Sequence, residues 1–320
     1  MTLLWRSEQQ RIALPRCVSF WYQAAVRPRL CGLIVLTLGA CATGGRPPGE
    51  GEPTPDTPGS IEPDGGTVQP NPDGPEPDTS VEPPTGASLL ISEVALAPAG
   101  GELIEIINPT AAAFDLSMYY FSDNGNYFKL PGGVTVESSD FIIRFNAGTS
   151  IPAGGVITVA LDTAASFQTT YGVAPTFALG SGGMQLIASS GTPTLTNAGE
   201  LVVLFRWDGV SDLVADSDLL LVGVPTAANG IVDKSGQAID GPDADATPTS
   251  YGTDSRTIAA QSAAPGAGQS TKRVALETGF EATGGNGITG DDETSENTAM
   301  TWDTTFTAPT PNAVPASLLP

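Results

Sequence analysis

Short apolar stretches separated by turn-forming residues follow one another along the chain from residue 88 onward. Within them, large apolar side chains occupy every second position, which is the period of a half-buried β-strand. The clearest predicted strands are Leu89–Leu96, Leu103–Ile107, Phe141–Phe145, Ile157–Leu161 and Leu201–Trp207. In the second of these, Ile104 and Ile106 share one face, and Glu105 is expected to point outward from the opposite face. This pattern is typical of an all-β protein.

Each predicted strand is apolar on one face, so a second layer has to cover it, and two packed sheets provide that layer. The sequence therefore predicts a β-sandwich. Ser122–Asn126 is expected to join two aromatic-rich strands, because Asn-Gly tolerates a tight hairpin and because Ser122 and Asp123 can bond to their own backbone. One short helix is expected over Ala164–Tyr171, where two aromatic residues lie four positions apart.

The segment before this domain has a different composition. Residues 41–87 are rich in proline, aspartate and glutamate and contain no aromatic residue. Such a segment cannot bury enough apolar surface to fold, so it is predicted to be a disordered, extended linker. Residues 1–40 are predicted to be a secretory signal, since residues 30–40 form a short apolar run after Arg27 and Arg29. That run is about half the length of a membrane-spanning helix.

The apolar run ends in Leu38-Gly39-Ala40-Cys41. This sequence resembles the lipobox of bacterial lipoproteins, in which the cysteine is lipidated and becomes the new N-terminus. The resemblance implies that the protein is exported and that a lipid on Cys41 anchors it in a membrane. It further implies a location at the outer membrane or cell surface.

A second resemblance covers residues 88–312 and is densest over residues 88–162. It rests on Leu90-Ile91-Ser92-Glu93-Val94, on Ile104-Glu105-Ile106-Ile107-Asn108-Pro109 and on Tyr119-Tyr120-Phe121-Ser122-Asp123-Asn124. These segments resemble the opening strands of lamin-tail domains, which implies an immunoglobulin-like β-sandwich. Lys272-Arg273-Val274 and Trp302 resemble the end of the family, and Trp302 is expected to fill the core.

In these motifs, Glu105, Asn108, Pro109, Ser122 and Asp123 are interpreted as structural residues. Proline after Asn108, for instance, ends a strand because it cannot continue a central ladder. An insertion with long acidic loops is expected at about residues 214–272, and residues 313–320 are expected to form a C-terminal tail.

The composition excludes several classes of active site. The chain has no histidine, and of its three cysteines only Cys41 would remain after export, bearing lipid. Triads that need histidine or a free cysteine are therefore excluded, as are thiolate and histidine zinc sites. We expect no enzymatic activity. The formal net charge of −22 also argues against contact with nucleic acid.

Calcium is the one specific ligand that the sequence raises, because clustered carboxylates on loops suit this cation. The candidate ligands are Asp240, Asp243 and Asp245, with Asp233 near them, and Asp291, Asp292 and Glu293, with Glu296 near them. Neither spacing matches an EF-hand, and a solvated acidic loop is the competing interpretation. No other cofactor is expected.

These observations predict a non-catalytic envelope lipoprotein that presents its β-sandwich for adhesion or interaction with an unidentified protein or surface partner. A purely structural envelope component and a calcium-binding surface module are the alternatives.

Overall fold

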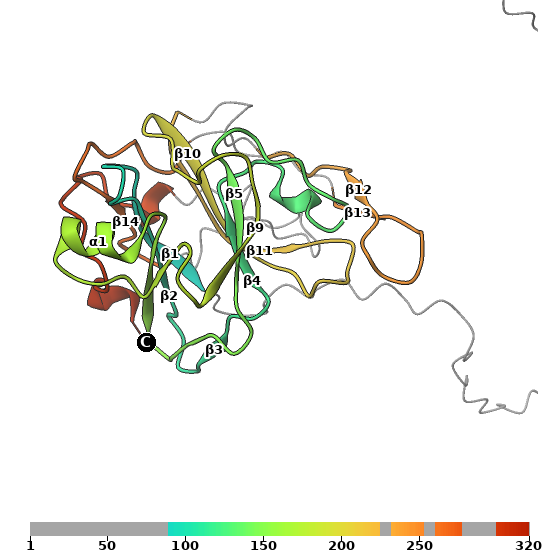
Figure 1. The fold of residues 1–320 in the computed structure, drawn as a ribbon, viewed down its shortest axis with the longest axis horizontal. Coiled ribbons are helices and arrows are strands. Elements are labelled where there is room, and N and C mark those ends of the chain that lie inside the picture. The colour runs from blue at the N-terminus through green and yellow to red at the C-terminus, as the bar shows by residue number, and fades with distance from the viewer. Residues whose placement is uncertain (1–88, 225–231, 253–259, 277–298, 320) are drawn as a thin grey trace, which may run out of the picture. The chain divides into compact units, whose positions relative to one another are not determined.

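A computed structural model describes residues 89–224, 232–252, 260–276 and 299–319 of the chain (Figure 1). One sheet contains β1 (Leu90–Ala95), β2 (Leu103–Ile107), β7 (Val156–Ala160), β8 (Phe177–Ala178) and β14 (Thr271–Lys272). A further sheet contains β4 (Tyr119–Ser122), β5 (Phe141–Phe145), β9 (Met184–Ser189), β10 (Gly199–Arg206) and β11 (Ala215–Gly223). Two small sheets pair β3 (Phe114–Asp115) with β6 (Ser150–Ile151) and β12 (Ala238–Ile239) with β13 (Thr249–Ser250). The helical elements are α1 (Ala164–Tyr171) and the 3-10 turns η1 (Tyr127–Lys129), η2 (Ala299–Thr301) and η3 (Ala316–Leu318).

The strand order is β14-β1-β2-β7-β8 in the first sheet and β11-β10-β4-β5-β9 in the second. Neighbouring strands run antiparallel except β7 and β8, which are parallel. Apolar side chains from both sheets form one buried cluster, which includes Ile104 and Ile106 of β2 and Phe141 and Phe145 of β5. Trp302 joins the same cluster, as expected for a core residue. The predicted all-β sandwich is therefore confirmed.

The outer face of the second sheet, which points away from the core between the sheets, is also covered by apolar side chains. Tyr120, Val203 and Phe205 project from it and pack in a separate apolar cluster with Ile239 and Tyr251. Part of the segment that the sequence analysis placed in an insertion is therefore apolar cover for this sheet. Residues 215–223, which lie inside that predicted insertion, form β11, and β11 pairs antiparallel with β10 along its length with one register shift. The first residues of the predicted insertion thus belong to the second sheet.

The expected tight hairpin at Asn124-Gly125 is corrected by the structure. β4 does pair with β5, but the next strand starts only at Phe141, and η1 occupies residues 127–129. Tyr127 and Phe128 belong to the apolar cluster on the outer face of the second sheet, so these aromatic residues anchor a longer connection. Tyr127 and Phe128, which were expected in a strand, thus lie in a short 3-10 turn with both rings buried.

The helix α1 has the bounds that the sequence predicted. Its N-terminus is capped by the Thr163 hydroxyl, which accepts a hydrogen bond from Ser166 N at 3.1 Å. Gly172 ends it at φ 75°, a left-handed conformation that glycine adopts without strain. Phe167 is fully buried against the first sheet, with Tyr171 packed beside it. Among the described residues, no helix has the length and apolar character that crossing a membrane requires.

Candidate functional site: a buried polar band beneath the C-terminal segment

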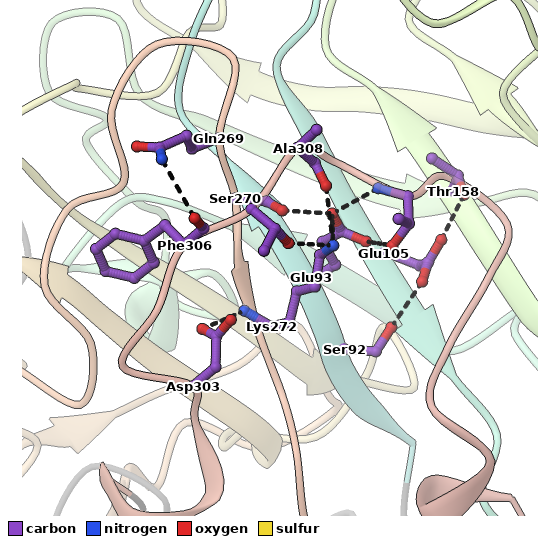
Figure 2. A network of polar contacts seen from close by, with 12 residues as sticks. Ser92, Glu93, Glu105, Thr158, Gln269, Ser270, Lys272, Asp303, Phe306 and Ala308 are labelled. Carbon is purple, nitrogen blue, oxygen red and sulfur yellow. Dashed lines mark hydrogen bonds and ion pairs between the residues drawn. The ribbon is translucent and has the colours of Figure 1, made fainter.

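The outer face of the first sheet carries a row of polar side chains between two apolar patches. The row, here called the polar band, consists of Ser92, Glu93, Glu105 and Thr158, which come from the neighbouring strands β1, β2 and β7 (Figure 2). The helix α1 covers the apolar patch on one side of this face, and Leu318 with Val314 covers another at the ends of β1 and β2. The residues of the polar band are 0–2% exposed. The two carboxylates are therefore buried on the outer face of the sheet, which the alternation of the strands alone would leave exposed to solvent.

Glu93 is held by donors that arrive from far along the chain. Its Oε1 accepts a hydrogen bond from Ser270 Oγ at 2.5 Å and another from Thr310 N at 2.9 Å. Its Oε2 accepts one from Thr310 Oγ1 at 2.9 Å, and Lys272 Nζ lies 3.8 Å from Oε1. One carboxylate thus joins β1 to β14 and to the C-terminal segment, which we define as residues 299–319.

Glu105 occupies the adjacent position on β2. Its Oε2 accepts hydrogen bonds from Asn312 N at 2.7 Å and Thr158 Oγ1 at 2.9 Å, and its Oε1 accepts one from Ser92 Oγ at 3.2 Å. Burial raises the pKa of Glu105 to about 7, and Glu93 adds to the increase by charge repulsion, while the hydrogen bonds partly offset it. Glu105 leaves the inner face as expected, but its carboxylate is fully buried. The C-terminal segment covers it.

Further contacts fix the C-terminal segment along β14. Ser270 N donates to Thr307 O at 3.0 Å, and Gln269 Nε2 donates to Phe306 O at 3.2 Å. Lys272 Nζ donates to Ala308 O at 2.9 Å, and Lys272 N donates to Asp303 Oδ1 at 3.1 Å (Figure 2). The two carboxylates of the polar band thus accept hydrogen bonds from Thr310 and Asn312 and hold the C-terminal segment in place.

Leu318 offers a direct test of how much this cover contributes. The side chain is fully buried between Leu90 and Ile107, whereas its neighbour Leu319 is 40% exposed. We expect Leu318→Ala to lower the free energy of unfolding by about 2–4 kcal/mol, since it leaves a cavity over the ends of β1 and β2. Leu319→Ala, the matched control, is expected to cost under about 0.5 kcal/mol. Urea unfolding of both variants measures the difference, and equal costs would contradict the packing role.

Two of the predicted calcium ligands lie together in the structure. Carboxylate oxygens of Asp240 and Asp243 lie within 4.8 Å of each other and of one from Asp212, which the sequence analysis did not propose as a ligand. Asp212 is fully buried and accepts hydrogen bonds from Gly241 N at 2.5 Å and Thr249 N at 2.9 Å. It therefore also fastens this loop to the sandwich.

The remaining acidic candidates do not join that trio. Asp245 accepts a hydrogen bond from Thr247 N at 2.6 Å in its own loop. Asp233 similarly accepts one from Ser235 N at 3.2 Å. The second predicted cluster, Asp291, Asp292 and Glu293 with the nearby Glu296, lies outside the described residues, as does Cys41.

The motif residue Asn108 organises a loop. It follows β2 directly, and its Nδ2 donates to Ala112 O at 2.7 Å and to Pro152 O at 2.9 Å. Its Oδ1 accepts from Thr110 N at 3.0 Å. Pro109 comes next, after the end of the strand. Asn108 therefore has a structural role, because both polar atoms of its side chain form hydrogen bonds with the surrounding loops.

Ser122 and Asp123 are fully buried at the end of β4. Ser122 Oγ accepts a hydrogen bond from Asn124 N at 3.0 Å and donates to Phe141 O at 2.6 Å. Asp123 Oδ1 accepts from Phe141 N at 2.7 Å, whereas its Oδ2 has no hydrogen-bond partner among the described residues. Burial raises the pKa of Asp123 well above its usual value, and the nearby Glu200 and Asp140 raise it further. The side chain is thus a buried acid that favours its neutral form.

The sequence analysis missed a buried ion pair between Asp218 of β11 and Arg273, which follows β14. Arg273 Nη2 donates to Asp218 Oδ1 at 2.8 Å and to Oδ2 at 2.7 Å, and both side chains are 0% exposed. The sequence offers only a Lys272-Arg273 dipeptide in a strongly acidic chain as a sign of this pair. That dipeptide does not indicate which of the many carboxylates binds Arg273.

Comparison with known families agrees with the fold. The family model of the Lamin Tail Domain matches residues 82–218, which include β1 to β10 and the first part of β11. The resemblance that the opening strands predicted is therefore confirmed over this segment. The match ends before Arg273 and the C-terminal segment. No curated protein and no solved structure matches the chain.

Proposed function

We propose that this protein is a non-catalytic, lipid-anchored lipoprotein of the cell envelope that displays its β-sandwich as an adhesion or protein-interaction module. The observation that carries the proposal is a β-sandwich matched by the Lamin Tail Domain model and preceded, in the same chain, by a lipobox-like Leu38-Gly39-Ala40-Cys41. Sandwich domains present loops on a rigid scaffold, which suits recognition of a partner. The proline-rich residues 41–87 would hold the domain away from the membrane.

The buried chemistry of the domain supports the non-catalytic part of this proposal. The polar band is enclosed by the C-terminal segment, and its carboxylates accept hydrogen bonds from protein groups. A general acid or base has to reach a substrate, and these side chains are 0–2% exposed. Glu93 and Glu105 therefore act as structural acceptors.

The lipid anchor is tested by substituting Cys41 in the full chain. Cys41→Ala is expected to abolish labelling with radioactive fatty acid and to move the protein from the membrane fraction to the soluble fraction. Cys31→Ala is the control, since it lies in the predicted signal and is expected to keep both properties. Labelling that persists in the Cys41 variant would contradict the anchor.

The interaction role is tested separately by crosslinking on whole cells. Crosslinking through exposed carboxylates such as Asp115, Glu137 and Asp162, followed by mass spectrometry, is expected to recover one discrete protein partner with the wild-type chain and to lose it with Cys41→Ala. Recovery of lipid and of diverse abundant envelope proteins alone would favour a purely structural component instead.

Calcium binding is a second candidate function, favoured by the approach of Asp212, Asp240 and Asp243 to within 4.8 Å. Three carboxylates at this spacing offer the oxygen ligands that calcium prefers. We expect calcium at about ten times its dissociation constant to raise the Tm by about 3 °C. Asp240→Asn is expected to remove the increase, and Asp245→Asn, outside the trio, to retain it. A thermal melt in millimolar calcium and in chelator measures both, and identical melting would exclude the site.

A further inference from the structure

The strand β9 forms an open edge of the second sheet. It is the last strand in the order β11-β10-β4-β5-β9, and it pairs only with β5. Among the described residues, none donates to or accepts from the outer backbone edge of β9. The side chains of Leu186 and Ile187 are 43% and 38% exposed there. This edge therefore offers unpaired backbone groups flanked by apolar side chains.

The same edge carries no charge. Residues 163–199 contain no aspartate, glutamate, lysine or arginine, although the whole chain has a formal net charge of −22. Proline is also absent from β9. Natural proteins protect open edges with charged residues, proline or bulges. Here the only such device is a bulge, which leaves Ile187 unpaired between Leu186 and Ala188.

A bulge on one edge of a strand does not prevent another strand from pairing with its opposite edge. The strand β1 of this protein is an example. The register of β1 with β2 shifts between Ile91 and Glu93, leaving Ser92 as the extra residue. β1 nevertheless pairs with β14 on its other edge, and the carbonyl of Ser92 itself accepts a hydrogen bond from Arg273 N at 2.8 Å. The bulge of β9 is therefore compatible with another strand beside it.

We propose that β9 pairs antiparallel with β9 of a second copy of this chain, joining two second sheets across a two-fold axis. Two strongly acidic copies repel each other over most of their surfaces, so the charge-free edge is where their approach costs least. In antiparallel pairing, the two identical edges exchange the same hydrogen bonds, and the symmetry closes the assembly at a dimer. The pairing does not require the lipid on Cys41.

The dimer is expected to be weak. Stable interfaces bury about 1,200–2,000 Å² in total, and one six-residue strand supplies less. Crosslinking that traps a transient pair is therefore the suitable measurement. One cysteine at a time is added to the full chain, which already contains three, by Gln185→Cys, Leu186→Cys or Ile187→Cys, each in a parallel set with Cys41→Ala. Mild oxidation and non-reducing gels then report the disulfide-linked dimer.

We expect a covalent dimer of the chain that is strongest at one position of β9 and falls on either side, because residues near the two-fold axis meet their own copies. Val210→Cys, at a 52% exposed position in the loop between β10 and β11, is the control and should give no excess over the parent chain. No dimer above that control, or an adduct only with a different protein, would overturn the proposal. The Cys41→Ala set is expected to dimerise equally. A wrong prediction about the lipid anchor would therefore leave the dimer yield unchanged, whereas a wrong prediction about β9 pairing would abolish the dimer in both sets.

A second variant tests the edge by charge. Adding Ile187→Lys to the chain with a cysteine at Gln185 places like charges near each other across the axis and is expected to lower the dimer yield about fivefold. Val210→Lys in the same background should leave the yield unchanged. The Tm of both lysine variants is measured in parallel, so that a loss of folding is recognised. An unchanged yield in a folded Ile187→Lys chain would overturn the pairing.

Discussion

Replacing Arg273 with methionine is expected to lower the free energy of unfolding by about 3–5 kcal/mol, because it leaves the buried carboxylate of Asp218 without its counter-charge. The guanidinium is fully buried and bonds both carboxylate oxygens at 2.7 and 2.8 Å. Its Nε also donates to Ile91 O at 2.7 Å, and its Cζ lies 4.7 Å from the ring centroid of Trp302. One side chain thus connects β1, β11 and the C-terminal segment.

The neighbouring residue provides the matched control for this variant. Lys272 bears the same charge, but its side chain is 16% exposed and its nearest carboxylate oxygen lies 3.8 Å away. We expect Lys272→Met to cost no more than about 1 kcal/mol. Urea unfolding of the two variants, each carrying Cys41→Ala, compares them. Equal costs would contradict the central role of the Arg273–Asp218 pair.

A double variant separates the ion pair from the packing around it. Burial already raises the pKa of Asp218 despite the presence of Arg273, so an Asp218 left alone in Arg273→Met is expected to become protonated. Asp218→Asn removes that unpaired acid. Combined with Arg273→Met, it is expected to recover at least about 1 kcal/mol relative to Arg273→Met alone, a coupling that a double-mutant cycle measures. Strict additivity of the two changes would show that the residues do not act as a pair.

The fold could be predicted because its signals are local. Leu103–Ile107 and Phe141–Phe145 were predicted from alternation alone and have those bounds in the structure. The helix Ala164–Tyr171 was likewise set by residues within a few positions of one another. Such patterns indicate which face of each strand or helix is apolar. Two sheets that are each apolar on one face bury those faces by packing against each other, so the sandwich follows from the pattern.

The polar band could not be predicted, because its cover comes from the other end of the chain. Alternation correctly placed Glu105 on the face opposite Ile104 and Ile106, but nothing within the strand indicates that Asn312 N lies 2.7 Å from that carboxylate. The acidic trio shows the same limit. Asp240 and Asp243 are close in sequence and were proposed together, whereas Asp212 joins them only through folding.

The second large effect concerns pH. We expect the protein to be more stable at pH 5.5 than at pH 8, with a Tm about 10 °C higher. Burial raises the pKa of Glu102, Glu105 and Glu200 to about 7 and that of Asp140 to about 6. The raised pKa of Asp123 acts in the same direction.

The sign follows from proton binding in the two states. These acids have ordinary pKa values near 4 when the chain is unfolded, so between about pH 4.5 and pH 7 the folded state binds more protons. Stability falls with rising pH wherever the folded state holds the extra protons. The loss is complete once the pH passes the raised folded pKa values near 7. Calorimetry at constant ionic strength from pH 5.5 to pH 8 measures the slope.

Glu105→Gln distinguishes this cause from a general effect of the negative net charge. The amide resembles the protonated acid but does not titrate, so the variant is expected to lose clearly less Tm between pH 5.5 and pH 8 than the parent chain. Glu137→Gln removes an exposed carboxylate, and it should keep most of the parent slope because Glu137 raises the pKa of Asp140 less than burial does. If general repulsion caused the slope, both substitutions would reduce it equally, since each removes one negative charge. A Tm that rises toward pH 8 would contradict the protonated state of the buried acids altogether.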